Sequence, residues 1–283
     1  MAAAGQAQDA WPALGIIAGG GSLPARLAAA AQSQGRRVFV LALQGHADAA
    51  ALEAVPQEWI RLGEAGRAIA LLRKAGVREV VMAGPVRRPA LSELYPDWRT
   101  LRFFARLGFK ALGDDGLLKA VIGELESEGF CVIGAQSVLG DLLARPGVWG
   151  KYSPDLQAKA DIEHGLRVAL GLGALDIGQS VVVQQGIVLG VEAIEGTDAL
   201  IERCGRLARQ GAGGVLVKIA KPGQEKRVDL PTIGTTTIQN LAKAGLRGIA
   251  VEAGATLVVE EDAVVAAADT AGLFVIGLDK AAE

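Results

Sequence analysis

Short apolar runs alternate with helical segments through the first third of the chain, and this alternation constrains the fold more than any other feature. The runs are four to six residues long and rich in Val, Ile, Leu and Ala. Such runs are typical of strands buried on both faces of a parallel sheet, with helices as the crossovers between them. We therefore expect a Rossmann-like α/β sheet with strands at 14–18, 38–43, 59–62, 80–83 and 130–133.

The second half of the chain predicts a different sheet. Turn-forming residues at 145–154 precede it, and the sequence Gln-Gln-Gly between the β-rich runs at 180–183 and 187–191 predicts a hairpin. Later runs alternate with helical segments, so we expect antiparallel and parallel pairings to mix. The prediction is a two-domain α/β protein with an N-terminal Rossmann-like domain of parallel sheet and helices at 1–140, an interdomain linker at 141–155, and a C-terminal mixed-sheet α/β catalytic domain at 156–283.

Composition excludes several functional classes. Lys and Arg number 29 against 31 Asp and Glu, so the chain has no general basic field, and no nucleic-acid partner is expected. A signal-peptide pattern and an apolar stretch of about 18 residues are both missing, which predicts a cytoplasmic protein. Cys131 and Cys204 fit a reducing compartment, and we expect buried, inert thiols, with a disulfide between them as the alternative.

A glycine-rich turn follows the first predicted strand. Gly19, Gly20, Gly21 and Ser22 lead into a predicted helix, whose amino-terminal amides and dipole favour a phosphate. The dinucleotide fingerprint G-x-G-x-x-G fails because Pro24 holds its sixth position, and no Gly-Lys-Ser or Gly-Lys-Thr completes a P-loop. The turn is therefore a candidate site for a phosphate or nucleotide other than NAD or ATP. A tight turn between strand and helix is the alternative.

Two basic segments of the first half are candidates for binding anions. Gly84 and the residues after it follow a predicted strand, where Arg87 or Arg88 could clamp a phosphate; two solvated arginines are the alternative. Residues 98–110 predict a basic amphipathic helix that suits an anionic lipid surface or an acylated ligand. The alternative is a surface helix whose aromatic side packs on the core. The basic stripe of this helix consists of Arg99, Arg102, Arg106 and Lys110.

Acidic residues close to lysines are the catalytic candidates of the second half. Three acids lie within Gly190-Val-Glu-Ala-Ile-Glu-Gly-Thr-Asp198, although Asp198 could equally cap a helix. Lys218 ends an apolar run, and Lys221 and Asp229 follow it. Lysines can neutralise phosphate while a carboxylate orients metal or water. Mg²⁺ needs one or two carboxylates plus phosphate oxygens, so these acids suit it better than a transition metal.

Several segments together resemble one family. They are Gly15 to Pro24, Gly113 to Leu118, Gly134-Ala135-Gln136, Asp176 to Gln184, Gly190 to Asp198, Lys218 to Pro222, Asp229-Leu-Pro231 and Gly248 to Gly254. In these segments the chain resembles the LpxI-type UDP-2,3-diacylglucosamine pyrophosphatases of lipid A synthesis in Gram-negative bacteria. The resemblance spans about residues 14–278, and Gly190 to Asp198 is its most specific part.

The resemblance implies an activity. It implies Mg²⁺-dependent hydrolysis of the pyrophosphate of UDP-2,3-diacylglucosamine to UMP and 2,3-diacylglucosamine 1-phosphate (lipid X). Water attacks the phosphorus on the sugar side, and the two domains hold the ligand between them. The expected partners are this acylated nucleotide sugar and the inner-leaflet membrane surface, to which the cytoplasmic protein would bind peripherally; a homodimer is left open. A non-catalytic nucleotide-sugar or lipid-binding protein is the alternative, and an oxidoreductase is disfavoured by the failed fingerprint.

The resemblance also implies site residues. Asp229 is expected to be the essential aspartate, Asp198 and Lys218 complete the catalytic set, and both aspartates are the expected metal ligands. Glu225 stands where the family often has Asp, so the charge is kept. Substrate contacts are expected from Ala18, Gly19, Gly20, Gly21, Ser22, Gly84, Arg87, Ala135, Gln136, Gln179, Thr197 and Lys221.

Overall fold

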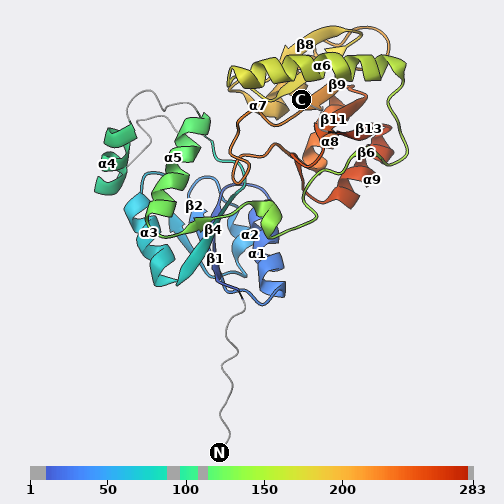
Figure 1. Ribbon diagram of the computed structural model, residues 1–283. Helices are drawn as coiled ribbons and strands as arrows, with labels where there is room; N and C mark the ends of the chain where they lie inside the picture. The colour runs from blue at the N-terminus through green and yellow to red at the C-terminus, as the bar shows by residue number, and fades with distance from the viewer. Residues whose placement is uncertain (1–10, 88–95, 108–113, 280–283) are drawn as a thin grey trace, which may run out of the picture. The chain divides into compact units, whose positions relative to one another are not determined.

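The computed structural model describes residues 11–87, 96–107 and 114–279. These residues belong to two compact units, Met1–Gly140 and Asp141–Glu283 (Figure 1), and each unit is described by itself. Each is built around its own β-sheet with helices packed against it. This is the α/β fold class that the alternating apolar runs predicted.

The first unit contains a parallel sheet, formed among the described residues by five strands in the order β3-β2-β1-β4-β5. The predicted Rossmann-like sheet is therefore confirmed. The strand order reverses between β1 and β4, and open α/β sheets bind ligands at the carboxyl ends of the strands beside such a switch point. Figure 1 shows α1 and α3 on opposite sides of the sheet. The elements are β1 (Ala13–Ala18), α1 (Leu23–Ser33), β2 (Val38–Leu43), α2 (Ala49–Leu52), β3 (Gln57–Ile60), α3 (Ala65–Lys74), β4 (Val77–Ala83), α4 (Trp98–Leu107), α5 (Asp114–Ser127), β5 (Cys131–Val132) and the 3₁₀ turn η3 (Ala135–Ser137).

The second unit contains a mixed sheet, in which six strands of the described chain follow the order β6-β13-β11-β9-β7-β8. β9, β11 and β13 run parallel, whereas β7 is antiparallel to both of its neighbours and β6 is antiparallel to β13. The predicted mixture of pairings is confirmed. The elements are β6 (Gly147–Trp149), α6 (Leu156–Ala174), β7 (Ser180–Gln184), β8 (Ile187–Val191), α7 (Gly196–Gly205), β9 (Val215–Lys218), β10 (Thr232–Ile233), α8 (Thr235–Lys243), β11 (Gly248–Glu252), β12 (Leu257–Val258), α9 (Glu261–Ala271) and β13 (Phe274–Leu278).

Alternate side chains of the second sheet enter two separate cores. Val181, Val183 and Val217 pack with α6, whereas Val182 and Leu216 pack with α7, α8 and α9. Successive side chains of a strand point to opposite faces, so an unbroken apolar run fills both cores. Figure 1 shows α6 on one side of this sheet and α8 and α9 on the other. Continuous Val and Leu runs are therefore the expected sequence for these strands.

The predicted hairpin is confirmed. β7 pairs with β8, and Gln185 and Gly186 have φ values of 54° and 76° at the turn, as tight hairpin turns require. Asp161 of α6 is buried, and its carboxylate accepts the amides of Gln185 over 3.0 Å and Gly186 over 2.6 Å. These bonds attach the turn to the helix that packs on β7. The position of the whole hairpin is thereby fixed at its turn end.

Part of the segment expected to form the linker is a strand. β6 lies within 141–155 and pairs antiparallel with β13. Trp149 at its end is buried, and its indole Nε1 donates to the carbonyl oxygen of Arg145 over 3.0 Å. Residues 147–149 are therefore built into the sheet of the second unit rather than forming a separate connection.

The expectation of two buried thiols is wrong for one cysteine. Both are free thiols in the described structure; Cys204 is buried in α7, and burial raises its pKa. Cys131 is exposed. It lies in the edge strand β5, where Val132 takes the buried face and the preceding side chain must point the other way.

Candidate active site

The polar groups of the second unit gather where three strands of its sheet begin or end. Lys218 is the last residue of β9, and it pairs in register with Ser180, the first residue of β7. β7 runs antiparallel to β9, so its amino end lies beside the carboxyl end of β9. Glu192 directly follows β8, and its amide donates to the carbonyl oxygen of Ser180 over 2.8 Å. The hairpin therefore brings Glu192 to the end of β9.

A chain of hydrogen bonds joins Lys218 to Glu192. The Nζ of Lys218 donates to Oγ1 of Thr197 over 2.5 Å, and the Thr197 hydroxyl donates to Oε1 of Glu192 over 2.7 Å. The other carboxylate oxygen of Glu192 accepts the amide of Gln179 over 3.3 Å. Only 4% of Lys218 and 6% of Glu192 are exposed. Buried ions are costly unless they are hydrogen-bonded and paired, so this chain of bonds lets both charges remain inside.

Three carboxylates act on the buried lysine. Burial lowers the pKa of Lys218, and the charges of Glu192, Asp198 and Asp229 raise it in opposition. Two of the predicted catalytic residues, Asp198 and Asp229, therefore lie within electrostatic range of the third, Lys218. Glu192, one of the three candidate acids of the Gly190 to Asp198 motif, joins them, although the sequence assigned it no role. Its position directly after an apolar run, inside the most specific motif, was the signal for it in the sequence.

Asp198 does not cap α7, which was the other interpretation of its sequence position. The N-cap residue of α7 is Glu195, and Asp198 lies in the first turn of the helix. Its Oδ1 accepts Nδ2 of Asn240 in α8 over 2.9 Å. Asp198 as a whole is exposed. A bond from α8 therefore orients a carboxylate that solvent and ligands can reach.

The loop after β9 places Lys221 at the same end of the sheet. The Nζ of Lys221 forms an ion pair with Asp176 over 2.8 Å, and its amide donates to Oε1 of Gln224 over 2.9 Å. Gln179 accepts the amide of Ile219 at its backbone oxygen over 3.0 Å. The side-chain Oε1 of Gln179 is buried, and no described residue donates a hydrogen bond to it. These residues border the end of β9 that carries Lys218.

The donor set at this end of the sheet fits Mg²⁺ but not a protein-only metal cage. Within the described ranges no group of three or more His, Cys, Asp or Glu residues could hold a metal ion. Mg²⁺ needs fewer protein ligands because water and substrate phosphates complete its shell. Asp198 and Asp229, both within electrostatic range of Lys218, would supply hard carboxylate oxygens. Glu225 instead forms an ion pair with Nε of Arg227 over 2.9 Å.

In the first unit, the glycine-rich turn packs against the loop after β4. The amide of Gly19 donates to the carbonyl oxygen of Ala83 over 2.8 Å, and that of Gly20 donates to Pro85 over 2.9 Å. Gly84 has a φ of 88°, and a Cβ added to it would lie 2.2 Å from the oxygen of Gly20. Glycine is therefore required for this close backbone approach at the switch point. The interpretation of a tight turn accounts for these two amides.

The other substrate-contact candidates of this unit lie at the same strand ends. Ala18 and Ala135 are buried, whereas Gly21 and Ser22 are exposed, and Ser22 makes no side-chain capping bond. The exposed Arg87 donates its amide to Nδ1 of His46 over 3.3 Å. The side chain of Gln136 lies against Gly134, where an added Cβ would lie 2.4 Å from its Nε2. Arg88 lies outside the described residues. The carboxyl ends of β1, β4 and β5 thus carry all of these candidates.

The basic helix α4 turns two of its arginines toward α5. Arg99 forms ion pairs with Glu128 and, over 2.9 Å, with Glu124; Arg106 pairs with Glu124 over 3.3 Å. The exposed face instead carries Trp98, Leu101 and Arg102, with 79% of Trp98 exposed. Lys110 lies outside the described residues. The predicted basic stripe is therefore partly neutralised within the unit, while an aromatic residue of the helix faces solvent. No helix in the described ranges is long and apolar enough to cross a membrane.

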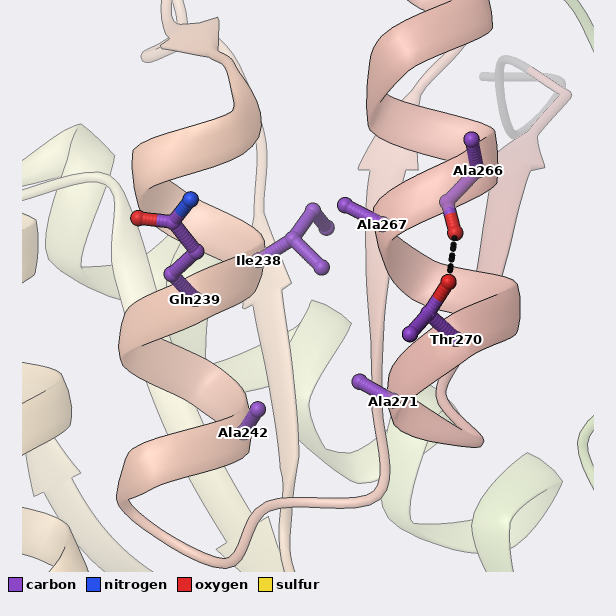
Figure 2. Close-up of a pocket in the computed structure, with 7 residues that line it drawn as sticks. All are labelled: Ile238, Gln239, Ala242, Ala266, Ala267, Thr270 and Ala271. Carbon is purple, nitrogen blue, oxygen red and sulfur yellow. Dashed lines mark hydrogen bonds between the residues drawn. The ribbon is translucent and has the colours of Figure 1, made fainter.

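Lys218 and the residues around it, Thr197, Glu192, Asp198 and Asp229, are called the lysine cluster. A pocket between α8 and α9 has no charged groups of the kind found in this cluster. Figure 2 shows its lining, which is mostly small and apolar, with a volume of about 430 Å³. The hydroxyl of Thr270 donates to the carbonyl oxygen of Ala266 over 2.8 Å. No titratable side chain is among the lining residues Ile238, Gln239, Ala242, Ala266, Ala267, Thr270 and Ala271. The candidate active site is therefore the lysine cluster.

Comparison with known proteins identifies the family. The model of the LpxI N-terminal domain matches residues 13–142, and that of the LpxI C-terminal domain matches residues 145–276. The chain belongs to the LpxI family. A relative from Caulobacter vibrioides, named UDP-2,3-diacylglucosamine pyrophosphatase LpxI, is 47% identical over 273 residues, which are 94% of this chain and 97% of the relative. The solved structure of CobK precorrin-6A reductase matches with 14% identity over 95% of this chain and 89% of its own. Its TM-score of 0.32 is too low to indicate a shared fold.

The close contact of Gly84 with the backbone of Gly20 in this LpxI-family chain predicts that an added side chain at Gly84 lowers stability more than one at an open glycine. Gly84→Ala should lower the free energy of unfolding by about 3 kcal/mol, because the left-handed backbone costs about 1–2 kcal/mol and overpacking against Gly20 adds to it. Gly35→Ala is the matched control: its φ of 77° carries the same backbone cost, but nothing lies within 4 Å of the added Cβ. Urea unfolding followed by circular dichroism measures both. Equal losses in the two variants would contradict the close-approach argument.

Proposed function

We propose that this LpxI-family chain hydrolyses the pyrophosphate of UDP-2,3-diacylglucosamine in a Mg²⁺-dependent reaction that gives UMP and 2,3-diacylglucosamine 1-phosphate, with substrate contacts from both domains. The name of the 47% identical relative supports the substrate. The observation that carries the proposal is the buried Lys218 with three carboxylates around it at the carboxyl end of a strand. A phosphate-binding cation beside acids is the arrangement that phosphoryl transfer to water needs.

Each charged group has a task in this reaction. Lys218 donates hydrogen bonds to the oxygens of the pyrophosphate and compensates the charge that develops there. Asp198 and Asp229 would hold Mg²⁺ together with the pyrophosphate oxygens. When bound, Mg²⁺ supplies Lewis-acid polarisation of those oxygens. Lys221, beside the same strand end, adds a second positive charge for the substrate.

The bond changes are those of hydrolysis at one phosphorus. The oxygen of water forms a bond to the phosphorus on the sugar side, and the bond from that phosphorus to the bridging oxygen breaks. The electron pair leaves on that oxygen as UMP. Asp229 accepts the proton of the attacking water as general base. In the first domain, Gly21, Ser22, Arg87 and Gln136 would contact polar parts of the substrate from the strand ends.

The first experiment separates catalysis from binding. The purified protein is incubated with UDP-2,3-diacylglucosamine and either Mg²⁺ or EDTA, and products are followed by ³¹P NMR. We expect UMP and the sugar 1-phosphate with Mg²⁺ and no product with EDTA. In ¹⁸O-labelled water the label should enter the sugar 1-phosphate and not UMP. Substrate binding without product under either condition would instead support a non-catalytic nucleotide-sugar-binding protein.

The role of Asp229 can be tested by removing its charge. Asp229→Asn should lower kcat by at least about 100-fold, because general-base and charge-stabilising contributions have this size. Substrate affinity, measured by isothermal titration, should change far less. Asp262→Asn removes an exposed carboxylate from the first turn of α9 and is the matched control. If Asp229→Asn keeps turnover near that of Asp262→Asn, Asp229 is not the base.

The exposed face of α4 supports peripheral binding of a cytoplasmic protein to the inner-leaflet surface, where the acylated substrate resides. Trp98→Ala/Leu101→Ala should weaken co-sedimentation with anionic liposomes by at least about tenfold, since each side chain contributes roughly 1.5–3 kcal/mol on burial. The matched control is Leu156→Ala/Leu175→Ala. It removes the side chains of the first residue of α6 and of the residue that caps its carboxyl end, which are 86% and 71% exposed, and it should leave liposome binding unchanged. Equal liposome binding by both double variants would contradict a membrane role for α4.

A homodimer, left open by the sequence analysis, stays a prediction from the sequence.

A further inference from the structure

Thr197 links Lys218 to Glu192 through two hydrogen bonds, and the donors and acceptors available determine the direction of each bond. An ammonium group donates and cannot accept, so Oγ1 of Thr197 must accept from Nζ of Lys218. A hydroxyl has one proton, and Thr197 gives it to Oε1 of Glu192. The Oγ of Ser180 lies 3.4 Å from the same hydroxyl. The hydroxyl of Thr197 therefore has a donor and an acceptor within the protein, whereas the sequence predicted a substrate contact for this residue.

Glu192 is held more firmly than a surface carboxylate. Its Oε2 accepts the amide of Gln179, and its own amide donates to Ser180. Gly178 packs against its backbone so closely that an added Cβ would lie 2.0 Å from the Glu192 carbonyl oxygen. Backbone of β7 and the residues before it thus fixes where the carboxylate points. Thr197 stands between this fixed carboxylate and the flexible end of a lysine side chain.

We propose that Glu192 is a positioning residue for the hydrolysis, acting through the hydroxyl of Thr197 to hold the Lys218 ammonium in the orientation that meets the pyrophosphate. The inference rests on the proposed function. Lysine has four rotatable side-chain bonds, and ordering it during the reaction would cost rotamer entropy. One N–H of Lys218 is bound to Thr197, which leaves its other two N–H groups in set directions. Preorganised donors of this kind act without reorganising as the reaction proceeds.

The hydroxyl of Thr197 is the element to remove. Thr197→Val keeps the shape of the side chain but can neither accept from Lys218 nor donate to Glu192. We expect kcat to fall about 100-fold, the size that misplacement of a reacting group produces, while KM changes little. Thr197→Ser keeps the hydroxyl and should retain most of the activity. Thr270→Val is the matched control, because it removes a hydroxyl bonded in α9, outside the lysine cluster. Urea unfolding of each variant accompanies the kinetics.

A double-mutant cycle shows whether Glu192 acts through Thr197. Glu192→Gln keeps an acceptor oxygen but removes the charge, and it should lower kcat in the wild-type background. In the Thr197→Val background the same change should have little further effect, since the link to Lys218 is already broken. Fully additive losses would overturn the proposal, and so would a Thr197→Val enzyme as active as Thr270→Val. An equal kcat loss in Thr197→Ser and Thr197→Val would also overturn it, because the hydroxyl would then not matter. If the wild-type protein forms no product, the proposed function itself fails, and that outcome is distinct from these.

Discussion

The second unit depends on accommodating a lysine side chain at the buried end of β9. Lys218 is almost fully enclosed, and a buried ion is tolerated where hydrogen bonds and opposite charges compensate for lost water. The mixed sheet provides them. A parallel neighbour on that side would bring its own carboxyl end to Lys218, whereas antiparallel β7 brings Ser180 and, through its hairpin with β8, Glu192. The start of α7 then adds Thr197 and Asp198. The strand direction that the hairpin imposes is therefore what assembles the cluster.

The sheets could be predicted from the sequence because apolar runs that fill two cores are long enough to recognise. The hairpin and the class of each sheet were confirmed on that basis, and each strand predicted in the first unit overlaps an observed one, although β3 is Gln57–Ile60 rather than 59–62. Contacts that join distant segments could not be predicted in the same way. Arg99 and Arg106 looked like a free basic stripe along one helix, but their partners are Glu124 and Glu128 of α5. The prediction that Cys131 is buried was wrong for a related reason, because the composition of a strand does not show whether it lies at the edge of a sheet.

The candidate site was predictable to a different degree in each unit. Asp198, Lys218 and Asp229 came from the resemblance and the pattern of acids near lysines, and both aspartates lie within electrostatic range of Lys218. Glu192 was one of the candidate acids, but its role could not be predicted, because its link to Lys218 depends on the register of an antiparallel pair. In the first unit, the amides of Gly19 and Gly20 bind carbonyl groups after β4. Spacing alone cannot separate a glycine needed for a ligand from one needed for the approach of two backbones.

Charge balance connects the buried lysine to the expected cation. Glu192, Asp198 and Asp229 are three acidic residues whose charges act on a single lysine. Burial lowers the pKa of Lys218, and the charges of these acids oppose that effect. The same negative field would repel an anionic pyrophosphate at close range. Asp198 and Asp229, the two more accessible acids, would hold a divalent cation together with the phosphate oxygens, and its charge would offset that repulsion. Glu192 is bonded to Thr197 instead. The acids around Lys218 are thus the physical reason for proposing that the reaction depends on Mg²⁺.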